Sequence, residues 1–130
     1  MLIISGLGTF QWDEAASSPV RYLSVIVLIP LLEEWIFRGW LLDAIRKRTQ
    51  ATAQDSTTGR GLISRANALS TFAFVALHAL TRDPMSAFAV MIPSLYLGKT
   101  KEVGAHWLHC AALHGFWNLS WFSVMPLPEL

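Results

Sequence analysis

The chain has 130 residues, of which 53% are hydrophobic and only 15% are charged, and its formal net charge at pH 7 is +1. A soluble domain normally carries about 25% charged residues, so this composition and the long apolar blocks favour an integral membrane protein. The near-neutral charge gives no electrostatic basis for nucleic-acid binding. The single cysteine, Cys110, excludes an internal disulfide and a cysteine-based zinc cluster.

Apolar segments follow one another along the chain and predict an all-α fold, an integral membrane bundle of about four transmembrane helices. A single membrane-embedded domain, 1–130, contains the candidate helices 20–48, 62–81, 85–97 and 104–125. A spanning helix needs roughly 20 residues, a length that the first, second and fourth segments reach. The third is shorter and contains Pro93, so we expect it to be short, tilted or broken.

The polar breaks between these segments carry most of the basic residues and predict the orientation of the chain. With four spans, the loops 43–65 and 99–102 lie on the same side, which the positive-inside rule assigns to the cytoplasm. Both ends of the chain then face outward. A compact chain with outward-facing ends favours a bacterial plasma membrane.

Ionisable and amide side chains inside the apolar segments are the candidate functional residues, because such groups are rare there and usually face a cavity or one another. They are Glu33, Glu34, Arg38, His78, His114 and Asn118. Glu34 and Arg38 have the spacing of neighbours on a helix and can pair. His114 and Asn118 have the same spacing. Glu33 points about 100° away from Glu34, so we expect it either to stay protonated or to meet a histidine.

These residues form three motifs in order on separate hydrophobic segments. "EEWIFR" fits Glu-Glu-x-x-x-Arg, "FVALH" fits Phe-x-x-x-His, and "HGFWN" fits His-x-x-x-Asn. Over roughly residues 30–119, the chain therefore resembles the CPBP family, the CAAX proteases and bacteriocin-processing enzymes that are also called the Abi family. The resemblance implies a glutamate-dependent intramembrane endopeptidase that cleaves near the membrane surface. We expect it to need no cofactor.

By similarity, Glu33 and His78 hold and activate a water, and His114 and Asn118 stabilise the oxyanion. The residue types suit this chemistry. A carboxylate beside an imidazole can share the proton taken from water and later deliver it to the leaving amine. An amide and an imidazole N–H are neutral donors suited to a charge that appears only in the transition state.

The resemblance also implies that Glu34 and Arg38 are a supporting pair that orients the helix. The substrate classes that it implies are prenylated CAAX tails, leader peptides and sorting tails. The expected partners are therefore a membrane-associated peptide or protein substrate and the lipid bilayer. A bundle of only about four spans also leaves open whether the protein forms a homo-oligomer.

Two alternatives stand beside this interpretation. Two glutamates and several histidines could form a zinc or iron site of a metal-dependent membrane protease. However, Glu-x-x-His and His-Glu-x-x-His are both absent, and Arg38 beside the acids would repel a cation. The other alternative is a non-catalytic membrane scaffold or immunity protein that keeps the polar cluster for packing. His106, His109 and Cys110 match no motif, and we expect packing or solvated roles for them.

Overall fold

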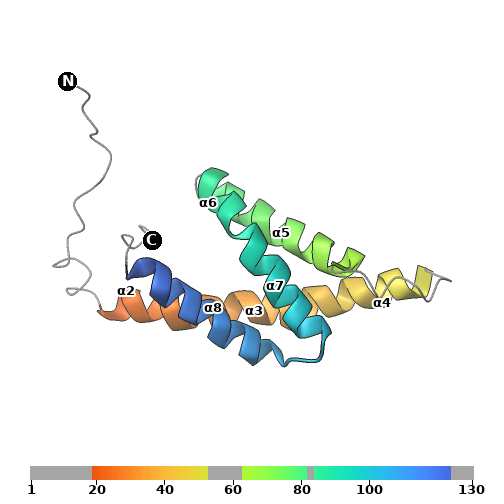
Figure 1. Ribbon diagram of the computed structural model, residues 1–130, viewed down its shortest axis with the longest axis horizontal. Helices are drawn as coiled ribbons and strands as arrows, with labels where there is room; N and C mark the ends of the chain where they lie inside the picture. The colour runs from red at the N-terminus through yellow and green to blue at the C-terminus, as the bar shows by residue number, and fades with distance from the viewer. Residues whose placement is uncertain (1–18, 53–62, 82–83, 124–130) are drawn as a thin grey trace, which may run out of the picture.

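The computed structural model describes residues 19–52, 63–81 and 84–123, and all regular structure in these ranges is helical. The first range is one long rod (Figure 1) that consists of α2 (Pro19–Leu23), the π-helical stretch η1 (Ser24–Leu28), α3 (Ile29–Glu34), the π-helical stretch η2 (Trp35–Leu41) and α4 (Leu42–Thr52). It is followed by α5 (Arg65–Thr81), α6 (Pro84–Ala89), α7 (Met91–Glu102) and α8 (Trp107–Phe122). The predicted all-α class is confirmed for these ranges. Within them, no helix combines the length and the apolar character that crossing a bilayer requires.

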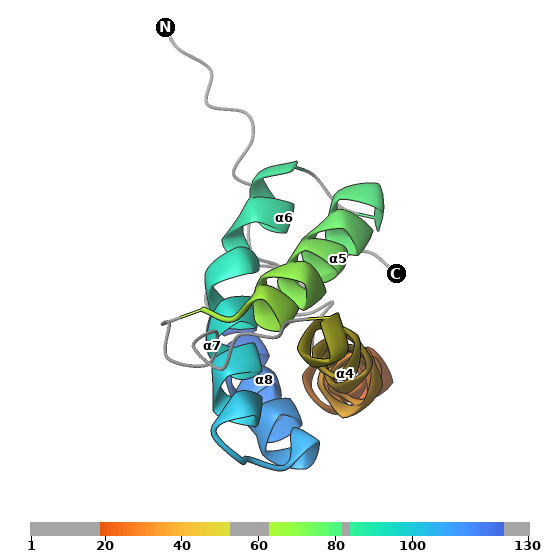
Figure 2. The same cartoon turned by 90° about the vertical axis from the view of Figure 1, so that its right-hand side faces the viewer.

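The other helices pack around the rod. α8 lies along its N-terminal half, in contact with η1 and α3, while α5 packs against α4 (Figure 1). α7 lies between α5 and α8 and contacts both. Figure 2 looks nearly along the rod and shows α5 above it and α7 and α8 to its left. The helices that carry the three motifs therefore surround a common space.

Two segments that the sequence assigned to loops are helical where the structure describes them. The first part of the predicted loop 43–65 belongs to α4, and the predicted loop 99–102 is the last turn of α7; residues 53–62 lie outside the described ranges. The sequence RKRTQAT continues α4 because Arg, Lys, Gln and Ala are good helix formers. Lys99 and Lys101 favour the C-terminal turn of α7, where cations interact well with the helix dipole.

The third apolar segment is broken, as expected for a segment that contains Pro93. The break lies at Val90, between α6 and α7. Proline cannot donate to the carbonyl four residues before it and its ring crowds that carbonyl. The carbonyl in question belongs to Ala89, which ends α6. Pro93 is accepted in the first turn of α7, where its missing N–H would have no intrahelical partner.

Pro30 affects the rod in a related way. It lacks the N–H that would bond to the carbonyl oxygen of Ile26 in a regular α-helix, and Ile26 lies within the π-helical stretch η1. The same carbonyl oxygen faces α8, where a Cβ built on Gly115 would clash with it. Among the glycines of the described ranges, Gly115 therefore makes the closest contact between α8 and the backbone of the rod.

We expect Gly115→Ala to lower the free energy of unfolding by about 1–3 kcal/mol, as overpacking of a close contact usually does. The obstacle is a backbone carbonyl, which cannot turn aside like a flexible side chain. Thermal unfolding of the purified protein in detergent measures the effect. Gly39→Ala is the control, since a Cβ there meets side-chain atoms at an ordinary 3.5 Å. Equal stability of the two variants would contradict the close approach of α8.

Candidate active site

A cavity of about 550 Å³ opens between the rod, α5, α7 and α8. Its wall holds all four side chains to which the resemblance assigns catalysis: Glu33, His78, His114 and Asn118. Most of the remaining wall is apolar and includes Trp117, Trp121 and Phe122. The structure thus brings together residues from three separate helices in one pocket with few polar groups.

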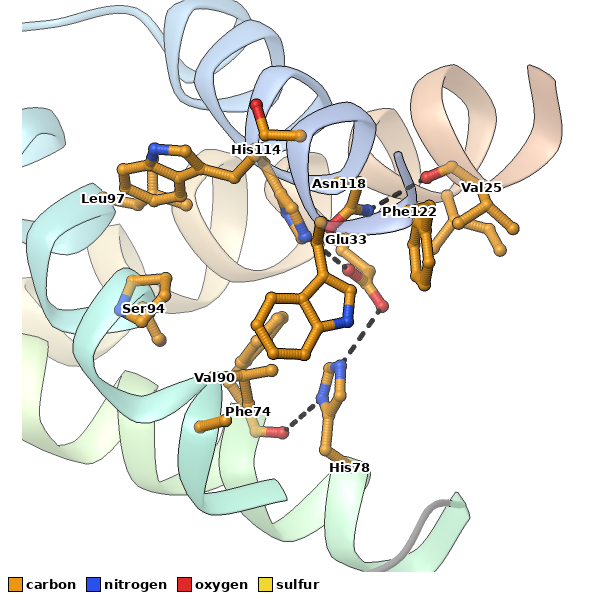
Figure 3. Close-up of a pocket in the computed structure, with 16 residues that line it drawn as sticks. Val25, Glu33, Phe74, His78, Val90, Ser94, Leu97, His114, Asn118 and Phe122 are labelled. Atoms are coloured by element: carbon orange, nitrogen blue, oxygen red, sulfur yellow. Dashed lines mark hydrogen bonds and ion pairs between the residues drawn. The ribbon is translucent and has the colours of Figure 1, made fainter. Parts of the chain in front are cut away.

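Glu33 lies between two imidazoles (Figure 3). Its Oε1 is 3.9 Å from Nε2 of His78, and its Oε2 is 3.7 Å from Nε2 of His114. Its side chain is 21% exposed, so it reaches the cavity rather than being closed off inside the helices. Of the two states expected from the sequence, the structure has the one in which this glutamate meets a histidine, and it meets two.

His78 is held by Phe74, the first residue of the same motif. Its Nδ1 lies 3.0 Å from the carbonyl oxygen of Phe74, one turn earlier in α5, and the two rings pack with centroids 4.4 Å apart. A carbonyl oxygen only accepts hydrogen bonds, so Nδ1 must carry the hydrogen. In the neutral imidazole, Nε2 then presents its lone pair toward Glu33.

His114 bridges the two adjacent glutamates. Its Nδ1 is 3.0 Å from Oε1 of Glu34, a buried carboxylate, while its Nε2 faces Glu33. Because an ionised carboxylate only accepts, Nδ1 carries a hydrogen, and Nε2 carries one only in the imidazolium form. A neutral His114 therefore donates from Nδ1, and a donor at Nε2 would require the imidazolium form.

The ion pair predicted between Glu34 and Arg38 is present, with Nη1 of the arginine 3.1 Å from Oε1 of the glutamate. Both side chains are buried. The second terminal nitrogen of Arg38, Nη2, donates to the hydroxyl and the carbonyl oxygen of Ser94. The guanidinium also lies over the ring of Phe74, 4.9 Å from its centroid. The pair therefore connects α3 and η2 to α7 and, through Glu34, to His114.

Asn118 follows His114 by one helical turn and lines the same cavity. Its Nδ2 donates to the carbonyl oxygen of Val25 in η1, at 3.0 Å (Figure 3). A side-chain amide nitrogen has two hydrogens, so this contact orients the amide and uses one of them.

Sequence reasoning missed a group of buried polar residues behind the site. Asn67, Thr71 and Ser94 are all buried, and all contribute to one set of hydrogen bonds that ends at Arg38. The signal was available: hydroxyl and amide residues inside apolar segments need partners. These residues are uncharged and belong to none of the three motifs, so they were not predicted.

The residues outside the motifs have the structural surroundings expected for them. The side chain of His106 caps the N-terminus of α8 by accepting from the backbone N–H of Leu108 at 3.3 Å. His109 is exposed, and Cys110 is buried with its sulfur 3.6 Å from the carbonyl oxygen of Leu97. Across the residues that the structure describes, no group of three or more His, Cys, Asp or Glu is arranged to hold a metal ion.

A protein-family model matches most of the chain. The family model described as type II CAAX prenyl endopeptidase Rce1-like matches residues 15–120, a range that contains all three motifs. No curated protein and no solved structure matches the chain. Members of this family are membrane proteins and proteases, which supports a membrane location and a hydrolase activity. The chain belongs to the Rce1-like family of type II CAAX prenyl endopeptidases.

Proposed function

We propose that the chain is an intramembrane endopeptidase that hydrolyses a peptide bond near the membrane surface, using a water activated by Glu33 and His78. The observation that supports this most strongly is the position of Glu33 between two imidazoles on the wall of a largely apolar cavity. The family to which the chain belongs supports the general activity. The distances between these side chains and their donor and acceptor roles support the proposed mechanism.

Glu33 and His78 are suited to hold one water between them. Oε1 of the carboxylate and Nε2 of the neutral imidazole are two acceptors 3.9 Å apart. A water that donates one hydrogen to each of two acceptors spans about 4.4 Å at ordinary hydrogen-bond lengths. In this position its lone pairs point away from both acceptors, toward a carbonyl carbon placed in the cavity.

The attack forms a carbon–oxygen bond and moves the carbonyl electron pair onto its oxygen. Glu33 takes the proton that the water loses. The resulting oxyanion is stabilised by Nε2–H of His114 in its imidazolium form and by the second N–H of Asn118. Removing one such donor typically costs about 100- to 1,000-fold in rate. Collapse of the intermediate breaks the carbon–nitrogen bond, and the proton held by Glu33 passes to the leaving amine.

The proposed substrate is a membrane-anchored peptide. The apolar wall of the cavity, with Trp117, Trp121 and Phe122, suits apolar side chains or a lipid group next to the scissile bond. The family's description favours prenylated CAAX tails, and leader and sorting peptides are the other proposed classes. The partners in either case are the peptide and the bilayer, and a second copy of the chain remains part of the proposal.

The test is cleavage of three peptide types, a prenylated CAAX tail, a leader peptide and a sorting tail, by the protein purified in detergent. Mass spectrometry identifies the products and the bond that is cut. Wild-type protein should cleave at least one peptide type, and His78→Ala should not. Equal product from both proteins would refute the site. No product from wild type with any peptide would favour the scaffold alternative.

Metal removal separates the proposed mechanism from a metalloprotease. We propose that no metal is required, so a chelator should leave the rate of cleavage within about 2-fold, since nothing in the water-activation step depends on a Lewis acid. The initial rate before and after prolonged dialysis against chelator measures this. Loss of cleavage with full recovery on adding zinc would establish the metal-dependent alternative instead.

A further inference from the structure

Ser94 binds Arg38 through both of its oxygens. Nη2 of the arginine donates to the Ser94 hydroxyl at 2.7 Å and to its carbonyl oxygen at 2.9 Å. The serine is buried in the first turn of α7, directly after Pro93. Hydrogen bonds to a charged donor are stronger than neutral ones, so these two fix the position of one edge of the guanidinium.

The hydroxyl of Ser94 is part of a chain of hydrogen bonds with one direction. Because its oxygen accepts from Arg38, its own hydrogen is donated onward, to Oγ1 of Thr71 at 3.1 Å. Thr71 donates to Oδ1 of Asn67 at 3.4 Å, and Nδ2 of Asn67 donates to the carbonyl oxygen of Leu95 at 2.9 Å. Within this hydrogen-bond chain, the hydroxyls of Ser94 and Thr71 each have one acceptor. A single arrangement of hydrogens therefore satisfies the chain.

The end of the hydrogen-bond chain at Asn67 is also held in place. Gly98 in α7 packs so closely on Asn67 that a Cβ built there would clash with the asparagine amide. The amide therefore has little room to rotate, and the contact fixes where α5 and α7 meet. The hydrogen-bond chain is thus anchored at one end to the buried guanidinium of Arg38 and at the other to the backbone of α7.

The arginine transmits this position to the catalytic residues. A guanidinium is planar and rigid, so the two hydrogen bonds of Nη2 restrict where Nη1 can lie. Nη1 is 3.1 Å from Oε1 of Glu34. The same oxygen accepts from Nδ1 of His114 at 3.0 Å. We infer that Ser94 is a positioning residue of the active site: it fixes Arg38 and thereby Glu34. Glu34 in turn directs Nε2 of His114 toward the cavity. The inference rests on the proposed function only for its catalytic consequence.

The experiment compares Ser94→Ala and Thr71→Val with the control Thr100→Val. The control removes a hydroxyl from the same helix as Ser94, but one that donates back to the carbonyl oxygen of Tyr96 within α7. Ser94→Ala and Thr71→Val should each lower kcat by about 10- to 100-fold, as small misplacements of a catalytic group do. Both should leave KM unchanged. They should also shift the ¹⁵N signals of the His114 imidazole in labelled full-length protein, and the control should not.

Coupling to Glu34 distinguishes positioning from a general loss of packing. In a Glu34→Leu background, Ser94→Ala should cause no further shift of the His114 signals, because leucine has no acceptor to link Arg38 to the imidazole. Unchanged His114 signals in Thr71→Val and Ser94→Ala, or a rise in KM alone, would overturn the inference. Thr71 does not line the cavity, so its variant decides the matter if Ser94→Ala fails to fold. If the wild type cleaves no peptide, the proposed function fails, and the imidazole signals still test the role of Ser94.

Discussion

Glu33→Gln is expected to lower kcat for peptide cleavage by about 1,000-fold, within the range that positioned acid–base groups contribute. The amide keeps the size of the carboxylate and its place between His78 and His114, but it cannot take a proton from the water or return one to the leaving amine. The stability of the fold should change little, because this side chain is partly exposed to the cavity. Initial rates and thermal unfolding of the same preparation measure both quantities.

Asp43→Asn is the matched control, since it makes the same chemical change at a carboxylate far from the cavity wall. Asp43 lies 3.4 Å from Lys101, and its side chain is 40% exposed. Exposed ion pairs of this kind are worth about 0–1 kcal/mol, so the control should retain wild-type kcat. A Glu33→Gln protein as active as Asp43→Asn would exclude the glutamate as the base.

Arg38→Met is expected to lower the free energy of unfolding by about 3–5 kcal/mol, the usual cost of breaking a buried ion pair by removing one partner. Methionine can fill much of the volume, but it leaves the carboxylate of Glu34 buried without its guanidinium partner. It also leaves the oxygens of Ser94 without their donor. Chemical or thermal unfolding in detergent, followed by circular dichroism, measures the loss.

The double variant Glu34→Gln/Arg38→Met tests the cause of that loss. Once the glutamate is neutral, no uncompensated charge is buried, so much of the stability should return. Cleavage should not return with it, because Nδ1 of His114 then no longer faces a carboxylate. A double variant that is no more stable than Arg38→Met would show that the arginine acts by packing rather than by charge.

Spacing and residue type were enough to predict the helical class, the pairing of Glu34 with Arg38, and the disruption at Pro93. All three are local: they depend on residues within about one helical turn. The same reasoning gave helix boundaries that were too short after residues 48 and 97, because polar residues at a helix end resemble a loop in the sequence. A hydropathy pattern does not distinguish lysines in the last turn of a helix from polar residues that begin a loop.

The sequence predicted that Glu33 could meet a histidine, but the other contacts between helices could not be predicted from the pattern. That His114 reaches Glu34 with one nitrogen and Glu33 with the other depends on how α8 is rotated against the rod. That rotation depends in turn on the close approach at Gly115. The role of Ser94 was equally hidden, because its partner Arg38 is distant in the chain. A lone serine after a proline carries no sign of which helix it will meet.

The two histidines differ in how their orientations are secured. The ring of His78 is fixed by Phe74 within α5 itself, whereas His114 depends on a carboxylate that a different helix supplies. Partial separation of α8 from its neighbours would therefore first disturb His114, the proposed oxyanion donor, and would leave His78, the proposed water ligand, aligned. A harsh detergent should produce protein that still folds α5 correctly and yet turns over slowly.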